Sequence, residues 1–77
     1  MTHRDISAVH FRRACKREGF TPRLWWLECP QTGVNYGMVF DRHGKLRRAA
    51  TLRHAIEQRA KDRAKAAARL ATLGTVA

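Results

Sequence analysis

The segment from Arg42 to Arg69 contains ten lysine or arginine residues but only two acidic residues, Glu57 and Asp62. It therefore supplies +8 of the formal net charge of +10 that the 77-residue chain carries at pH 7. Most of this segment is rich in alanine and poor in large apolar residues, which predicts one long helix. Because such a helix has few bulky side chains to bury, we expect its charge to face solvent or a polyanion.

The large apolar residues lie mainly at or before Ile56. A chain of this size builds one small domain whose core contributes about a few kcal/mol of stability. We therefore expect a single domain over residues 1–77, with a compact core at about 5–60 and a projecting basic helix at about 61–74.

A first helix is predicted over residues 2–18. Thr2 is a suitable N-cap, Asp5 lies where the helix dipole favours negative charge, and Gly19 suits the position just after the helix end. Three- and four-residue spacing separates an apolar face from a basic one. The apolar face consists of Ala8, Phe11, Ala14 and Cys15, and the basic face of Arg12, Arg13, Lys16 and Arg17.

Three short strands are predicted next, at residues 23–29, 34–41 and 45–48, joined by turns at 31–33 and 42–44. Alternation assigns the side chains of the first strand to two faces. Trp25, Leu27 and Cys29 lie on one face, and Leu24, Trp26 and Glu28 lie on the other. Tyr36, Met38 and Phe40 share one face of the second strand. The three strands would form an antiparallel β-meander.

The last helix is expected to begin after Thr51 as its N-cap, to run over about 52–73 and to stop at Gly74. Its first two or three turns would dock on the sheet, and the remainder would project. The residues expected to face the sheet are Leu52, Ile56 and Ala60. The predicted fold class is therefore α+β, with an N-terminal helix, a three-stranded antiparallel β-meander and a long basic C-terminal helix.

Arginine accounts for twelve of the sixteen cationic side chains, which favours bidentate contacts with phosphate. The residues predicted to contact nucleic acid or an acidic partner are Arg42, Lys45, Arg47, Arg48, Arg53, Arg59, Lys61, Arg63, Lys65 and Arg69. In sequence these charges wind around the helix rather than forming one stripe, which suits flexible RNA better than insertion into a groove. The alternatives are a merely solvated helix and, for residues 42–48, an edge strand whose charge discourages aggregation.

Trp25 and Trp26 are adjacent, so in one strand they would face opposite sides of the sheet. If one face is open to solvent, the exposed indole could stack on a base or anchor a protein interface, and Trp26 is our candidate. The alternative is a sheet covered by one helix on each face, which would bury both indoles.

We predict no catalytic residues, no metal site and no cofactor. The potential zinc ligands are Cys15, Cys29, His43 and His54, whose spacing matches no standard finger. The Ser7–His10 pair near Asp5 has no glycine elbow and no oxyanion donors. No P-loop or dinucleotide fingerprint is present. Both cysteines are expected to be free, buried thiols, and the protein is not expected to be an enzyme.

No apolar run approaches the roughly 20 residues of a membrane span, and no secretory segment is evident, so we expect a cytoplasmic protein without a membrane or small-molecule partner. In size and charge the chain resembles small regulatory proteins of phages and mobile elements. The first hypothesis is binding of RNA or DNA mainly through Arg/Lys–phosphate contacts. The alternative is a modulator or inhibitor that docks on a host nucleic-acid-handling machine, such as RNA polymerase or a CRISPR effector complex, and places its basic helix in the nucleic-acid channel.

Overall fold

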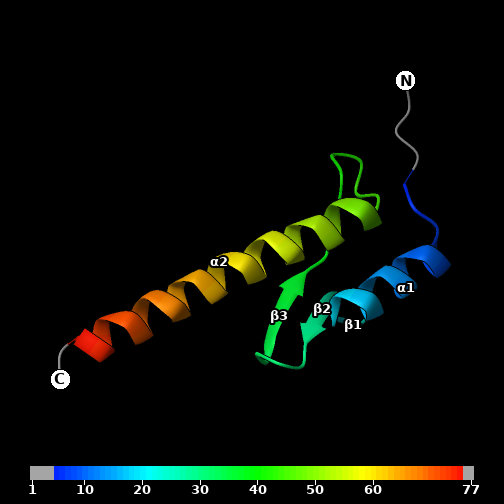
Figure 1. Ribbon diagram of the computed structural model, residues 1–77. Helices are drawn as coiled ribbons and strands as arrows, with labels where there is room; N and C mark the ends of the chain where they lie inside the picture. The colour runs from blue at the N-terminus through cyan, green and yellow to red at the C-terminus, as the bar shows by residue number, and fades with distance from the viewer. Residues whose placement is uncertain (1–4, 76–77) are drawn as a thin grey trace.

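The structure, a computed structural model, describes residues 5–75, with side chains described up to residue 72. One helix precedes a small antiparallel sheet in the chain and a second follows it, and the second helix extends well past the sheet (Figure 1). The elements are α1 (Ala8–Glu18), β1 (Thr21–Pro22), β2 (Trp26–Cys29), β3 (Val34–Gly37) and α2 (Arg48–Thr75). The predicted α+β class is confirmed: an N-terminal helix, three antiparallel strands and a long C-terminal helix follow one another along the chain.

Helix α1 begins later than the sequence pattern indicated. Ser7 is its N-cap, because its hydroxyl oxygen accepts a hydrogen bond from the His10 N–H at 3.2 Å. Thr2, the predicted cap, lies outside the described residues. The predicted end is confirmed: Gly19 has φ of 83°, and its N–H donates to the Lys16 carbonyl at 3.1 Å. This left-handed glycine closes the helix because it carries no Cβ.

The three strands are antiparallel and lie in the order β1-β2-β3, but their bounds differ from the prediction. Of the strand predicted at 23–29, only Trp26–Cys29 is a strand, and residues 23–25 form a turn in which the Arg23 N–H donates to the Trp26 carbonyl at 2.8 Å. The short strand β1 therefore pairs with β2, with Pro22 opposite Leu27. The pattern missed this turn because the sequence Arg-Leu-Trp carries none of the usual turn residues.

The predicted third strand at 45–48 reduces to a single bridge between Phe40 and Leu46. Two features shorten it. The Asp41 carboxylate accepts hydrogen bonds from the N–H groups of His43 and Lys45, at 2.8 and 2.9 Å, and so closes the loop. Helix α2 then begins at Arg48, inside the predicted strand. The predicted turn at 42–44 is present, with Gly44 at φ of 77°.

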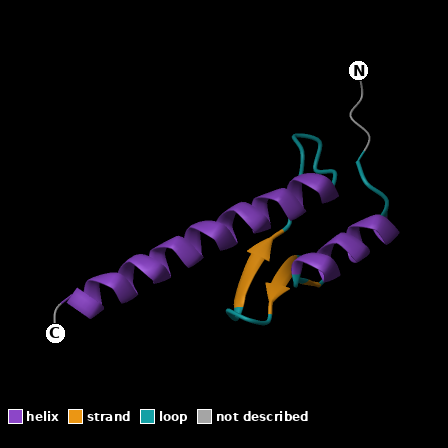
Figure 2. Ribbon diagram, in the orientation of Figure 1, coloured by secondary structure: helices purple, strands orange, loops and turns teal. Residues whose placement is uncertain are grey.

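Both helices cover the same face of the sheet (Figure 2). The core lies between this face and the two helices. Leu27 of β2 is directly opposite Tyr36 of β3, and both are buried, whereas Trp26 and Glu28 face the other side and are half-buried. The alternative of a sheet covered on both faces is therefore wrong. The buried core consists of Phe11, Cys15, Phe20, Leu27, Cys29, Tyr36 and Ala55.

The N-terminus of α2 is capped by a residue far away in the sequence. The Asp5 carboxylate accepts hydrogen bonds from the backbone N–H groups of Arg48 and Ala49, at 2.6 and 2.8 Å. Thr51, the predicted cap, instead lies in the first turn and is fully buried. Its hydroxyl donates to the Arg47 carbonyl at 2.7 Å and accepts from the Val39 N–H at 2.9 Å.

The buried side of α2 is set one position away from the predicted one. Thr51, Ala55 and Arg59 are buried, Leu52 and Ile56 are partly buried against the core, and Ala60 is exposed. All described side chains from residue 63 to residue 72 are exposed, so this part of α2 projects from the core. The helix continues through residue 74 to Thr75, so Gly74 is not its stop. Within the described part of the chain, no helix is both long enough and apolar enough to span a membrane.

Candidate nucleic-acid interface

Five of the six acidic side chains are engaged inside the molecule. Asp5 caps α2 and Asp41 closes its loop, as described above. Asp62 accepts a hydrogen bond from the Tyr36 hydroxyl at 2.9 Å. Ion pairs hold the other two, Glu18 to Arg59 and Glu28 to Arg23, at 3.3 and 3.2 Å. Because these five carboxylates make hydrogen bonds or ion pairs within the molecule, they leave an excess of arginine and lysine charge on the exposed surface.

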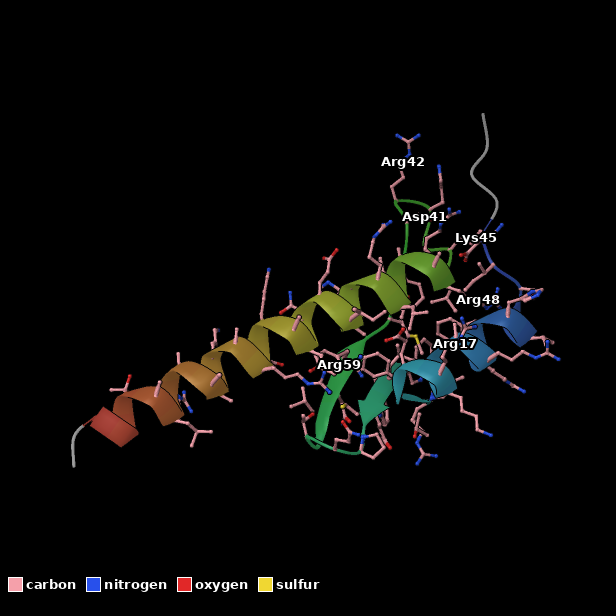
Figure 3. All side chains as sticks on the ribbon, in the orientation of Figure 1. Arg17, Asp41, Arg42, Lys45, Arg48 and Arg59 are labelled. Atoms are coloured by element: carbon pink, nitrogen blue, oxygen red, sulfur yellow. The ribbon has the colours of Figure 1, made fainter. Side chains whose placement is uncertain are left out.

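The loop before α2 presents two of the predicted contact residues, Arg42 and Lys45, both exposed (Figure 3). Arg47 and Arg48 follow at the start of the helix and are half-buried. The hydrogen bond from the Lys45 N–H is the main reason why the pKa of Asp41 lies below its ordinary value. Desolvation opposes this shift, while the hydrogen bond from the His43 N–H and the nearby charges of Arg47 and Lys45 add to it. The charged carboxylate keeps the loop closed at neutral pH.

Three of the exposed cations of α2 are aligned along one face of the helix, whereas the sequence suggested that the charges wind around it. Arg59 turns inward and Arg63 turns towards the β2–β3 turn, as shown below. Lys61, Lys65 and Arg69 are exposed, and their four-residue spacing places them on one face of the helix, about 6 Å apart along its axis. Arg53 is exposed nearer the start of the helix. A stripe of three cations therefore begins at Lys61 and continues along the projecting part of α2.

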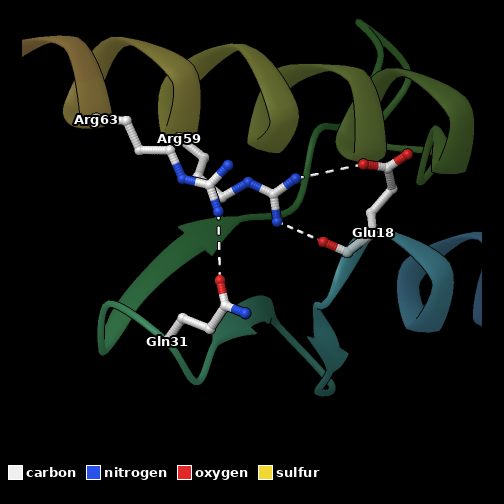
Figure 4. A network of polar contacts seen from close by, with 4 residues as sticks. All are labelled: Glu18, Gln31, Arg59 and Arg63. Carbon is white, nitrogen blue, oxygen red and sulfur yellow. Dashed lines mark hydrogen bonds and ion pairs between the residues drawn. The ribbon is translucent and has the colours of Figure 1, made fainter.

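Arg59 was expected to be a surface contact residue, but only 7% of it is exposed. Its guanidinium lies over the Phe20 ring, 4.2 Å from the ring centre, and donates to the Glu18 carbonyl and carboxylate (Figure 4). Arg59 thus fastens α2 to the C-terminal end of α1, and we assign it a structural role. The sequence concealed this role because Glu18 lies 41 positions away and Phe20 lies near it.

Arg63 marks the point at which α2 leaves the rest of the molecule. Its guanidinium donates to the Gln31 side-chain carbonyl at 3.3 Å, in the turn between β2 and β3 (Figure 4). The arginine itself is exposed. A single hydrogen bond between exposed groups contributes little to stability, so Arg63 remains available to a partner.

Helix α1 carries a second group of cations that our prediction of contact residues left out. Arg12, Arg13, Lys16 and Arg17 are all exposed, and Arg17 is labelled in Figure 3. The signal was present in the sequence as the basic face of the first predicted helix, but the higher charge density of residues 42–69 outweighed it.

Trp26 was predicted to be the exposed tryptophan, but Trp25 is the more exposed of the two. Trp25 lies in the β1–β2 turn and is 62% exposed, and the neighbouring Leu24 is 78% exposed. Trp26 faces the open side of the sheet, as alternation indicated, but it is half-buried and its indole N–H donates to the Glu28 carboxylate at 3.2 Å. Trp25 is therefore the more accessible aromatic side chain.

Replacing Trp25 with alanine should lower the free energy of unfolding by less than about 1 kcal/mol, since most of its surface is already in contact with water. The comparison is Leu27→Ala, which opens a cavity beneath a fully buried position and should cost about 3 kcal/mol or more. Urea denaturation followed by circular dichroism measures both. Equal losses for the two variants would place Trp25 in the core and contradict this placement.

Among the residues that the structure describes, no group of three or more His, Cys, Asp or Glu side chains could hold a metal ion. Cys15 and Cys29 are buried free thiols, as expected, and burial raises the pKa of the Cys15 thiol to about 11. His43 and His54 are exposed. The Ser7 hydroxyl lies 2.7 Å from His10 Nδ1, but it caps α1, while the Asp5 carboxylate is occupied at the start of α2. These contacts account for the Ser7–His10 pair as a helix-capping arrangement.

Comparison with protein-family models, with curated proteins and with solved structures finds no match for this chain. Any functional conclusion therefore depends on the geometry and charge of its own residues.

Proposed function

We propose that this chain is a small basic cytoplasmic protein that binds RNA or DNA, mainly through contacts of arginine and lysine with phosphates. The observation that supports this most is the stripe of Lys61, Lys65 and Arg69, which begins just before the projecting part of α2 and continues along it. Aligned cations on one helix face follow the regular charge of a nucleic-acid backbone.

Burial against the core does not account for the described part of the projecting segment, residues 63–72. Its described side chains from residue 63 onwards are exposed, and the neighbouring acid, Asp62, is occupied by the Tyr36 hydroxyl. A helix of this kind gains little stability from burial. A negatively charged partner would stabilise it by binding its cations. Arg42 and Lys45 on the loop, and Arg53 on α2, would supply further phosphate contacts.

Neutralising the stripe should weaken binding strongly. We expect the triple variant Lys61→Gln, Lys65→Gln, Arg69→Gln to lose about tenfold or more in affinity for a labelled 20-nucleotide single strand, and to reduce the salt slope by about 2 to 3. Fluorescence anisotropy across a range of salt concentrations measures both quantities. Glutamine has nearly the helix propensity of lysine and arginine, so α2 should remain intact.

The matched control removes the same charge from α1, as Arg13→Gln, Lys16→Gln, Arg17→Gln. This control should retain most of the affinity and of the salt slope. Equal losses in the two variants would mean that net charge alone governs binding, and no loss in the α2 variant would refute the proposal. Circular dichroism of both variants confirms that each is folded.

A second candidate function is a modulator that docks on a protein machine handling nucleic acid. Leu24 and Trp25 favour it, because two large apolar side chains protrude together from the β1–β2 turn. Retention of a defined protein partner after nuclease treatment would support this function, and loss of the partner on that treatment would contradict it.

A further inference from the structure

A groove of about 360 Å³ opens between α1, the β1–β2 turn and the start of α2, away from the cationic stripe. Its sides come from segments that are distant in the sequence, so the fold as a whole shapes it. The apolar lining residues are Ala8, Phe11, Pro22, Leu24, Met38 and Leu46. Leu24 stands at one side with 78% of its surface exposed, and Phe11, which is 6% exposed, also lines the groove.

The polar lining residues are all arginines: Arg12, Arg23 and Arg48. Arg12 is exposed and Arg48 is half-buried, whereas Arg23 is partly neutralised by its ion pair with Glu28. No acidic side chain lines the described groove. The groove therefore combines an apolar interior with guanidinium groups, which donate hydrogen bonds and accept none.

This combination selects among possible occupants. A nucleobase carries both donors and acceptors on its edge, and guanidinium groups satisfy only the acceptors. Each donor that is buried without a partner costs about 1–3 kcal/mol. The one aromatic lining residue, Phe11, is almost fully buried and offers little surface for stacking. An apolar side chain loses nothing there, and carboxylates beside it would match the guanidinium groups in a bidentate manner.

We propose that this groove is a docking site for an acidic segment of a partner protein, which inserts a bulky apolar side chain between carboxylates that bind Arg12 and Arg48. The site lies apart from the stripe of Lys61, Lys65 and Arg69, none of which lines the groove, and Arg48 is the one predicted nucleic-acid contact residue that it includes. One face of the molecule would thus recognise protein while α2 contacts nucleic acid.

The test is selection of a displayed library of random twelve-residue peptides against the full chain, freed of nucleic acid. We expect an enriched family with one bulky apolar residue flanked by aspartate or glutamate. Two single variants then localise its binding, measured by anisotropy with a synthetic peptide of that family. Leu24→Ser should weaken the affinity by about tenfold and Arg12→Gln by about fivefold, in the range of interface contact residues.

The controls separate the groove from general charge. Arg13→Gln removes the same charge from the next position of α1, outside the groove, and should change peptide affinity by less than about twofold. The α2 triple variant should bind the peptide like the unchanged chain, so that failure of the nucleic-acid proposal leaves this test intact. Leu24 is exposed enough for its substitution to preserve the fold.

Three outcomes would overturn the docking site. They are the absence of any enriched family, enriched peptides that bind Leu24→Ser and Arg12→Gln undiminished, and groove variants that lose affinity for the 20-nucleotide single strand but not for peptides. The last outcome would assign the groove to nucleic acid instead.

Discussion

Replacing Arg59 with alanine should lower the free energy of unfolding by about 2–4 kcal/mol, a large fraction of the stability of so small a domain. The Glu18 carboxylate contributes little to this loss, because its side chain is 40% exposed and solvent weakens the ion pair. The larger effects are the loss of the guanidinium from the Phe20 ring and an unpaired Glu18 carbonyl at the end of α1.

The matched control for this prediction is Arg63→Ala, four positions later on the same helix. Arg63 is exposed and makes one side-chain hydrogen bond at 3.3 Å, so its replacement should cost less than about 0.5 kcal/mol. Arg59→Lys retains the charge but not the planar fork and should recover only part of the loss. Urea denaturation measures all three variants. A loss for Arg63→Ala as large as for Arg59→Ala would contradict the structural role of Arg59.

Replacing Asp5 with alanine should cost about 1–2 kcal/mol, because two N–H groups at the start of α2 lose their acceptor. Burial raises the pKa of Asp5, but hydrogen bonds from Ala49, Arg48 and Ile6 outweigh it, so the pKa lies below the ordinary value of 3.8. The stabilisation is therefore present above pH 3.8 and is lost as the pH falls through the lower pKa of the folded state.

The variant Asp5→Asn separates the cap from the charge. Asparagine is also a good N-cap, so stability near pH 7 should stay within about 1 kcal/mol of the original, while the acid-dependent loss due to residue 5 disappears. Asp41 also has a lowered pKa, so the informative quantity is the difference between the two proteins at each pH. If Asp5→Ala is as stable as the unchanged chain from pH 2 to pH 7, Asp5 does not hold the start of α2.

The fold class followed from local sequence patterns. Apolar alternation correctly placed Leu27 and Cys29 on the buried face, and Gly19 and Gly44 marked real left-handed positions. Local patterns failed where a contact spans many residues. Thr51 looked like the cap of α2, but the cap is Asp5, 43 positions from Arg48, and the Thr51 hydroxyl bonds to the Arg47 carbonyl and the Val39 N–H instead.

The candidate interface was predictable in outline and not in detail. The charge of residues 42–69 is evident in the sequence, and so is the scarcity of bulky residues that leaves it exposed. Which cations are free to meet a partner depends on tertiary packing: Arg59 is held by Phe20 and Glu18, whereas Lys61, two positions later, is exposed. The turn that exposes Trp25 could not be predicted from the sequence either, because its residues carry no turn signature.

The most direct test of the central claim, that the projecting basic half of α2 serves to contact nucleic acid, is the salt dependence of binding by the unchanged chain. Anisotropy with the 20-nucleotide strand would be measured between about 50 and 200 mM salt. The logarithm of the association constant should fall linearly with the logarithm of salt concentration, with a slope of magnitude about 3 or more. A flat slope, or no binding at the lowest salt concentration, would contradict the claim.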